Sequence, residues 1–289
     1  MNVISKISDL RLSIDNLKNA GKTIGFVPTM GFLHEGHLTL AKEARANNEV
    51  VVMSIFVNPL QFGPNEDFDR YPRDVERDTE LARMSGVDIL FIPDVADMYR
   101  GKQSITMNVK ERVDVLCGRK REGHFDGVVT VLTKLFHLVQ PERAYFGEKD
   151  AQQVAVVEGL VRDYFFPVEI IRVPTVREED GLAKSSRNVY LSQEERQVAP
   201  FLYGSLKEAR KRIEDGERIP SVITGRISKI IQENTSGTID YVEVYSYPEL
   251  EELKRLEGDI ILAVAVQFQQ ARLIDNIIIS VQPEEDSYV

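Results

Sequence analysis

Apolar and polar residues along the first 180 positions form two alternating patterns. Short apolar runs bounded by glycine, proline or charged residues are typical of buried strands, and apolar residues recurring every three or four positions are typical of helices. The nearly continuous apolar run from Val50 to Val57 suits a parallel strand covered on both faces. The predicted strands are residues 23–28, 50–57, 87–93, 143–147 and 168–173. The predicted helices are residues 37–47, 74–85, 125–140 and 150–164.

Repeated strand–helix–strand order predicts an α/β fold with a Rossmann-like, doubly wound parallel sheet. The pattern changes after about Ser186. Two helical stretches, residues 193–217 with an interruption at Pro200 and residues 220–234, precede strands at 239–245, 259–266 and 276–280. This order predicts a smaller C-terminal α+β domain. We therefore predict one domain over residues 1–185 and a second, smaller domain over residues 186–289.

Composition narrows the class of protein. The hydrophobic share of 43% and the charged share of 28% exclude a disordered or repetitive chain. A net charge of −10 argues against a large nucleic-acid footprint, and no apolar run approaches the ~18 residues that span a bilayer. The first ten residues lack the apolar core of a signal peptide, and Cys117 is the only cysteine. We expect a cytoplasmic protein that binds neither nucleic acid nor membranes.

Two of the four histidines, His34 and His37, lie in the segment 30–37, directly after the first strong strand. Ligands of open parallel sheets bind beyond the carboxyl ends of the strands, where this segment falls. The glycines allow close approach of the backbone, and the N–H groups of the following helix start favour an anion. The i, i+3 spacing places both imidazoles on one side of a helical turn, where they could donate to phosphate oxygens.

Two other interpretations of this segment stay open. The first is a structural turn with a capping histidine, and the second is a zinc pair, for which the remaining histidines and one cysteine offer few further ligands. The segment is neither a P-loop nor a dinucleotide fingerprint, because Gly-Lys-Ser/Thr and G-x-G-x-x-G are both absent from it.

Three other clusters are candidates for binding polar groups. The segment 147–153 opens a predicted helix with Lys149, a point charge suited to phosphate, and Asp150, which suits a helix cap or a ribose hydroxyl. The segment 183–188 has two serines beside an arginine at the predicted domain junction and suits a clamp on a triphosphate. The segment 58–61 carries uncharged amides that suit a carboxylate or hydroxyl. A solvated helix start, an exposed linker and a turn-stabilising asparagine are the respective structural alternatives.

Taken together, these segments resemble the pantothenate synthetase (pantoate–beta-alanine ligase) family. The resemblance rests on an ordered set of motifs that runs over essentially the whole chain, at residues 28–37, 56–63, 123–130, 145–153, 180–188 and 271–276. It implies the nucleotidylyltransferase superfamily, in which a His-x-Gly-His signature, here His34 to His37, binds the phosphates of ATP. Position 184 is often apolar in the family, so Lys184 departs from its pattern.

The resemblance also implies an activity, ligands and site residues. The activity is ATP-dependent condensation of (R)-pantoate with beta-alanine through a pantoyl adenylate, with Mg²⁺ accompanying ATP, in a homodimer. His37, as proton donor, and His34 are the catalytic residues, Gln61 and Gln153 hold pantoate, and Gln61 also contacts beta-alanine. The residues implied in ATP binding are Met30, Gly31, Phe32, Leu33, His34, Glu35, Gly36, His37, Gly147, Glu148, Lys149, Asp150, Val176, Lys184, Ser185, Ser186 and Arg187.

Two other functions compete with this one. A nucleotidylyltransferase that transfers AMP to a phosphate acceptor shares the histidine signature, but such enzymes are usually shorter and have one domain. A non-catalytic nucleotide-binding module is disfavoured by the simultaneous presence of His34, His37, Lys149 and the serine–arginine segment. Product analysis and pyrophosphate release would distinguish these functions.

Overall fold

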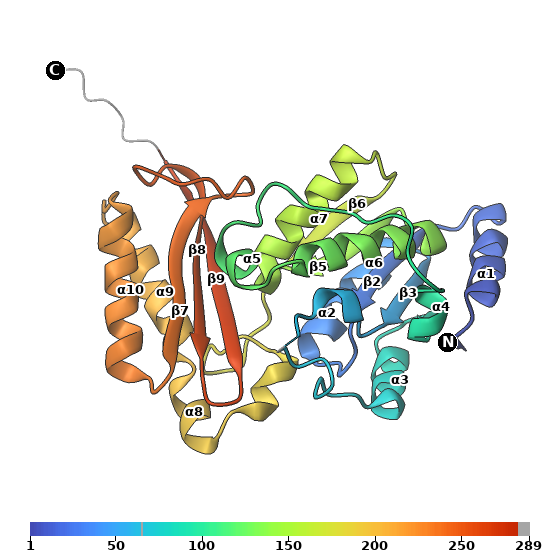
Figure 1. Cartoon of the computed structure of the whole chain (residues 1–289), viewed down its shortest axis with the longest axis horizontal. Coiled ribbons are helices and arrows are strands. Elements are labelled where there is room, and N and C mark those ends of the chain that lie inside the picture. Colours follow the sequence, from blue (N-terminus) through green and yellow to red (C-terminus); the bar gives the residue numbers. More distant parts are fainter. Residues whose placement is uncertain (65, 283–289) are drawn as a thin grey trace. The chain divides into compact units, whose positions relative to one another are not determined.

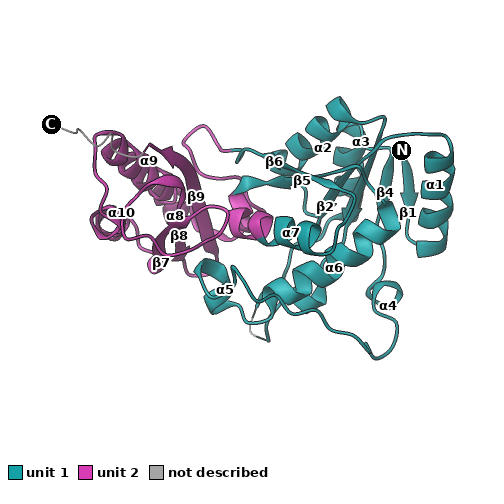
Figure 2. Cartoon of the chain, turned by 90° about the horizontal axis from the view of Figure 1, so that it is seen from above, with its two compact units in different colours: residues 1–148, 156–176 teal, residues 149–155, 177–289 magenta. Residues whose placement is uncertain are grey.

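The computed structural model describes residues 1–64 and 66–282 and divides the chain into two compact units. Figure 2 colours unit 1, Met1–Glu148 and Val156–Val176, apart from unit 2, Lys149–Ala155 and Arg177–Val289. The short piece Lys149–Ala155 thus belongs to the unit that is otherwise C-terminal. The domain ranges 1–185 and 186–289 stay a prediction, and residues 283–289 lie outside the described part of the chain.

Unit 1 is built on a six-stranded, fully parallel sheet with the strand order β1-β4-β3-β2-β5-β6 (Figure 1). The doubly wound α/β class predicted from the sequence is therefore confirmed. The strands are β1 (Asn2–Ile4), β2 (Ile24–Thr29), β3 (Val50–Ile55), β4 (Ile89–Phe91), β5 (Arg143–Gly147) and β6 (Glu169–Val173).

Helices cover both faces of this sheet, as the continuous apolar strands require. Val27 of β2 packs in one cluster with Leu40 and Ala44 of α2, while the neighbouring Phe26 turns its ring edge-on to Phe136 of α6 at 6.4 Å. In Figure 2, α2 and α3 lie on one side of the sheet and α6 on the other. The helices are α1 (Ile7–Asn19), α2 (Glu35–Asn47), α3 (Val75–Met84), α4 (Val95–Met98), α5 (Leu116–Lys120), α6 (His124–Val139) and α7 (Ala151–Asp163), with the short 3-10 turns η1 (Pro59–Gln61) and η2 (Glu148–Asp150).

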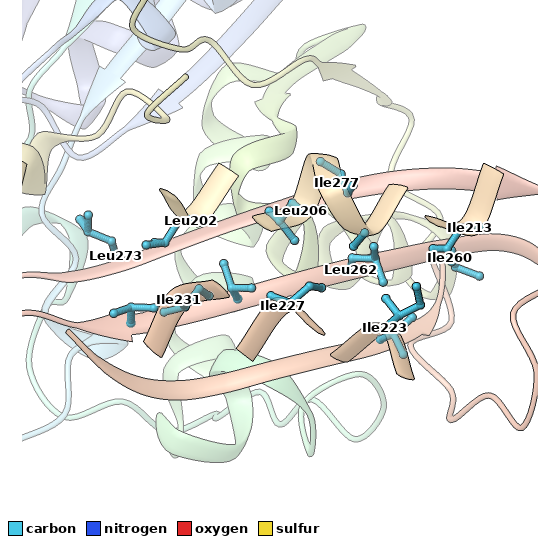
Figure 3. Close-up of a cluster of buried hydrophobic side chains, with 14 of the residues drawn as sticks. Leu202, Leu206, Ile213, Ile223, Ile227, Ile231, Ile260, Leu262, Leu273 and Ile277 are labelled. Carbon is cyan, nitrogen blue, oxygen red and sulfur yellow. The ribbon is translucent and has the colours of Figure 1, made fainter. Parts of the chain in front are cut away.

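Unit 2 packs helices against one antiparallel sheet of order β7-β8-β9. Ile223, Ile227 and Ile231 recur every four residues on α10 and meet alternate residues of β8, among them Ile260 and Leu262 (Figure 3). This confirms the predicted α+β character. The elements are η3 (Ser186–Tyr190), α8 (Gln193–Val198), α9 (Phe201–Glu214), α10 (Pro220–Asn234), β7 (Thr238–Ser246), β8 (Gly258–Gln267) and β9 (Arg272–Val281).

Some elements differ from the sequence prediction. Strand β1 and helix α1 were not predicted, although Leu10 and Ile14 of α1 are fully buried at helical spacing. The interruption predicted at Pro200 is present between α8 and α9, but α9 ends at Glu214, three residues earlier than predicted, because Gly216 adopts φ +104°. A residue with such a positive φ terminates a helix, and glycine adopts this conformation at little steric cost.

Candidate active site

In the unit 1 sheet, the order in which successive strands are added reverses between β2 and β5. Strands β3 and β4 lie on one side of β2, while β6 follows β5 on the other. A reversal of this kind leaves a crevice outside the carboxyl ends of the two strands, where open α/β sheets bind ligands. The segment 30–34 leaves β2 at this end, and Gly147 ends β5 there.

His34 and His37 lie together at the N-terminus of α2. The N–H of Gly36 donates to Nδ1 of His34 at 3.2 Å, and the N–H of His34 donates to Nδ1 of His37 at 3.3 Å. The ring centroids are 4.0 Å apart. The two side chains therefore form a capping box, in which each accepts a hydrogen bond from the first turn. The interpretation of this segment as a structural turn predicted one capping histidine, and both histidines have this role.

The capping bonds also determine which ring nitrogen carries the proton. An Nδ1 that accepts a hydrogen bond has no proton, so each neutral ring is protonated at Nε2. Both Nε2–H groups are then donors, held by the helix start at a sheet edge suited to anions. Capping and donation to phosphate are thus compatible, because they use opposite nitrogens of the same ring.

Asp78 of α3 holds the loop that leads into this helix start. Its carboxylate accepts from the N–H of Phe32 at 2.6 Å and of Leu33 at 2.7 Å, and its side chain is 1% exposed. Burial raises the pKa of this carboxyl above its ordinary value, against the opposing effect of the two backbone hydrogen bonds. At Gly31, with φ +83°, a Cβ would lie 2.8 Å from Ile55. Nothing in the local sequence pattern indicated this contact of Asp78.

Gln61, the predicted pantoate residue, is buried after β3 in the turn η1. Its side-chain amide donates to Sδ of Met30 at 3.2 Å and accepts from Nδ2 of Asn58 at 3.1 Å. Asn58 in turn donates to the carbonyl of Gly127 at 3.0 Å and accepts from the hydroxyl of Tyr99 at 2.7 Å. Burial raises the pKa of Tyr99, so this hydroxyl remains a donor. The structure thus brings together Met30 and Gln61, which were predicted to bind different substrates.

The main chain of Gln61 is held by Arg121, which follows α5, and by His124, the first residue of α6. Nδ1 of His124 lies 2.8 Å from the carbonyl oxygen of Gln61, and Arg121 donates to the same oxygen at 3.3 Å. A carbonyl only accepts, so Nδ1 of His124 carries the proton in this contact. Arg121 also pairs with Glu66. Burial opposes ionisation of Glu66, but the hydrogen bond and charge of Arg121 outweigh it and lower the pKa of this carboxyl.

The other predicted residues near β5 divide between the two units. Gly147 and Glu148 belong to unit 1, whereas Lys149, Asp150 and Gln153 belong to unit 2. The Nζ of Lys149 lies 3.8 Å from the carboxylate of Asp150, and the two side chains are 19% and 51% exposed. The predicted lysine is therefore half-buried beside a solvated carboxylate at the start of α7.

The predicted triphosphate clamp is a structured turn and not an extended linker. Oγ of Ser185 accepts from the N–H of Arg187 at 3.3 Å and caps η3, and Ser186 is buried. Lys184, the residue that departs from the family pattern, forms an ion pair with Glu178 at 2.9 Å. These residues belong to unit 2, and Val176 is the last residue of unit 1.

A parallel sheet with this reversal, and a helix start with two imidazoles beyond it, place the chain among the doubly wound α/β proteins. Helix starts in this position commonly bind phosphate-bearing ligands in that class. Residues 2–278 match the model of the family described as pantoate-beta-alanine ligase. The chain belongs to this family. It is a ligase, and the family resemblance predicted from its motifs is confirmed.

Named relatives and solved structures support the same family assignment over nearly the whole length of the chain. The chain is 62% identical to the pantothenate synthetases of Bacillus pumilus (strain SAFR-032) and Bacillus subtilis (strain 168), with 99% or more of each chain covered. It is similar to the crystal structure of pantothenate synthetase from Thermus thermophilus, with 46% identity, 98% and 100% coverage and a TM-score of 0.91. A ligase structure from Francisella tularensis, complexed with beta-gamma ATP and beta-alanine, shares 34% identity with 96% and 97% coverage and a TM-score of 0.79.

Proposed function

We infer that this chain condenses (R)-pantoate with beta-alanine at the expense of ATP and releases pantothenate, AMP and pyrophosphate. The pantoate carboxylate attacks the α-phosphate of ATP, which gives pantoyl adenylate and pyrophosphate. The amine of beta-alanine then attacks the acyl carbon, and AMP leaves. Family membership over residues 2–278, together with the Francisella complex of a 34% identical ligase with beta-gamma ATP and beta-alanine, supports this reaction.

The chemistry requires activation because a carboxylate is a poor acyl donor. Oxide is a poor leaving group, and conversion to a mixed anhydride with AMP replaces it with a good one. A site for such a transfer works by positioning the reactants and stabilising charge at phosphorus. Hydrogen-bond donors held in place before the reaction suit this need better than a side-chain nucleophile.

His34 and His37 are proposed to donate from Nε2 to phosphate oxygens of ATP. The observation that carries this proposal is the pair of Nδ1 capping bonds, which orient both rings and place the proton of each neutral ring on the opposite nitrogen. His37 is proposed as the main donor while negative charge builds on the phosphate. A literal proton transfer is not required in the first step.

The remaining assignments follow the family resemblance. Gln61 and Gln153 are proposed to hold pantoate, with Gln61 also near beta-alanine. The amide of Gln61 is already oriented by Asn58 and Met30, which supports a role in recognising a polar substrate group. The residues proposed to contact ATP are Met30, Gly31, Phe32, Leu33, His34, Glu35, Gly36, His37, Gly147, Glu148, Lys149, Asp150, Val176, Lys184, Ser185, Ser186 and Arg187.

Mg²⁺ is proposed to enter with ATP as part of the substrate. Within residues 1–64 and 66–282, no group of three or more His, Cys, Asp or Glu residues is arranged to hold a metal ion. The nucleotide segments are rich in donors such as Lys149 and Arg187, which suit phosphate oxygens. Phosphates and water are therefore proposed as the main Mg²⁺ ligands, an arrangement that is usual for this ion.

The assembly and location of the chain are further parts of the proposal. A homodimer is proposed from the family resemblance, and sedimentation equilibrium measures the mass that tests it. The cytoplasm is proposed because Cys117 is the only cysteine of the chain. No helix in the described part of the chain is both long and apolar enough to cross a membrane.

Isotope exchange between pyrophosphate and ATP tests the order of the two steps. With pantoate present and beta-alanine absent, labelled pyrophosphate is expected to enter ATP, because pantoyl adenylate formation is reversible. Omission of pantoate, or its replacement by other small hydroxy acids, is the control. Release of ADP and phosphate in place of AMP and pyrophosphate would instead indicate an acyl phosphate and contradict the adenylate route.

A further inference from the structure

Strand β9 carries two buried polar residues, Asp275 and Asn276, for which the proposed reaction has no role. They end the motif Ala271–Asn276 that contributed to the family resemblance. Asp275 is 3% exposed and Asn276 is 8% exposed. Burial of a carboxylate is costly unless it is paired and hydrogen-bonded, so the partners of Asp275 indicate what this strand holds.

Asp275 forms a two-pronged ion pair with Arg177. The guanidinium donates from Nη1 to Oδ2 at 2.7 Å and from Nη2 to Oδ1 at 2.9 Å. The guanidinium carbon of Arg177 also lies 3.5 Å from the ring centroid of Tyr203, and the Arg177 side chain is 15% exposed. This planar, bidentate geometry fixes the orientation of Arg177 as well as its charge.

Arg177 begins a tight hairpin that joins two of the proposed ATP-binding segments. It follows Val176 directly, and it forms a β-bridge with Ala183, the residue before Lys184. The N–H of Glu178 donates to the carbonyl of Leu182 at 2.8 Å, and Arg177 donates to the carbonyl of Gly181 at 3.1 Å. The Lys184–Glu178 ion pair spans the same hairpin. Orientation of Arg177 therefore also orients the start of the segment 184–187.

Asn276 holds a third proposed ATP-binding segment. Its Nδ2 donates to the carbonyl of Lys149 at 2.9 Å, and its own N–H donates to Oδ1 of Asp275 at 2.8 Å. The hydroxyl of Tyr247 donates to the carbonyl of Ala151, two residues further on, at 3.3 Å. These side-chain contacts help explain why Lys149–Ala155 belongs to unit 2.

We propose that Asp275 and Asn276 are positioning residues that set the segments 149–150, 176–177 and 184–187 for ATP binding. This inference rests on the proposed function. Asp275 acts through the Arg177 hairpin, and Asn276 acts through the carbonyl of Lys149. Two adjacent residues of β9 thus hold the segments 149–150 and 176–177, whose nearest ends are 26 positions apart in the sequence.

The chain provides a matched control for a purely structural ion pair. Asp240 of β7 accepts two hydrogen bonds from Arg272 of β9 at 3.0 and 2.7 Å, and their side chains are 17% and 25% exposed. This pair joins β7 to β9 within the same sheet, and neither residue lies in a proposed ATP-binding segment. Asp240→Asn therefore removes a similar charge pair without releasing the Arg177 hairpin.

The experiment compares Asp275→Asn, Asn276→Ala and Asp240→Asn with the wild-type enzyme. The wild-type pyrophosphate exchange, measured first, tests the proposed function separately. The Kd for MgATP from calorimetry and the KM for beta-alanine are then measured for every variant that keeps its fold by circular dichroism. We expect a Kd for MgATP raised about 10-fold to 100-fold in Asp275→Asn and Asn276→Ala, because the released segments must be ordered again on binding and each tenfold step in Kd corresponds to only about 1.4 kcal/mol. The KM for beta-alanine should stay within about twofold.

Hydrogen exchange provides a second readout. Amides of residues 177–188 are expected to exchange faster in Asp275→Asn than in Asp240→Asn, because only the first releases the hairpin. If Asp275→Asn does not fold, Asn276→Ala decides the outcome. An unchanged Kd for MgATP in a folded Asp275→Asn or Asn276→Ala protein overturns the inference. The inference also fails if these variants raise both the Kd for MgATP and the KM for beta-alanine and Asp240→Asn raises them equally.

Discussion

The two histidines show how a side chain that caps a helix keeps a second ring nitrogen for the role at phosphate proposed above. His34 and His37 satisfy backbone N–H groups that a helix start otherwise leaves unpaired, and this use of Nδ1 places the proton on Nε2. Their position after a strand and their i, i+3 spacing were readable from the sequence. The protonated nitrogen was not, because it depends on which backbone groups each ring meets.

Substitution of His37 tests its proposed role at phosphate. His37→Ala is expected to keep the fold and to lower turnover by about 10²–10³-fold, the usual effect of losing one such donor. The lost cap adds a stability cost of about 1 kcal/mol. Steady-state kinetics with saturating substrates measure the first effect and thermal melting the second.

A control distinguishes the effect of losing His37 from that of losing a histidine elsewhere in the chain. His137 lies on the exposed side of α6, where its ring is 5.3 Å from that of Phe166. His137→Ala is expected to leave turnover near the wild-type value. Near-normal turnover in a folded His37→Ala protein would remove His37 from the mechanism.

At the scale of elements, close packing of α6 on η1 determines where Gln61 lies. A Cβ on Gly127 would lie 2.4 Å from the carbonyl oxygen of Leu60 and 2.6 Å from the backbone nitrogen of Gln61. Backbone atoms cannot move aside as a flexible side chain can. Gly127 is part of a motif that supported the family resemblance, but only the packing of two distant segments explains why glycine is needed there.

Alanine at this position is expected to reverse the usual effect of a helical glycine. In an open helix interior, Gly→Ala stabilises by up to about 1 kcal/mol. Gly127→Ala should instead lower the melting temperature and raise the KM for pantoate, because η1 is displaced. Gly225→Ala in α10 is the control, since a Cβ added there would meet nothing within 4 Å, and it should stabilise the protein. Equal stabilisation by both substitutions would contradict this account of the packing.

At the scale of the whole molecule, paired carboxylates make stability depend on pH. Burial opposes ionisation of Glu142, but its hydrogen bonds from Lys18 at 2.5 Å and from the N–H of Ile24 at 2.7 Å lower the pKa of its carboxyl. Arg121 has the same net effect on the pKa of Glu66. A carboxyl whose pKa is lower in the folded than in the unfolded chain stabilises the fold at pH values above its unfolded pKa of about 4.5. This stabilisation is lost as the pH falls through the folded pKa. Asp78 acts in the opposite direction, because burial raises its pKa.

Glu142→Gln tests this dependence. The melting temperature of the wild-type protein is expected to be lower at about pH 3.5 than at about pH 7. The variant should show a smaller decrease because it lacks the carboxylate whose protonation removes this stabilisation. Differential scanning calorimetry at both pH values measures the difference. The exposed Glu252→Gln serves as the reference, and a fall in Glu142→Gln equal to that of the reference would refute the assignment.

The sequence by itself determined the α/β class, most helices and strands, the family and the segments proposed to bind substrates. These features depend on local periodicity and on contiguous motifs, which a linear chain displays directly. The tertiary structure decided how those segments are held, through Asp78 and the loop at Phe32 and Leu33, and through Arg177 and Asp275, which are 98 positions apart. A hydrogen bond between distant positions leaves no periodic signal, because its partners become neighbours only when the strands and helices pack.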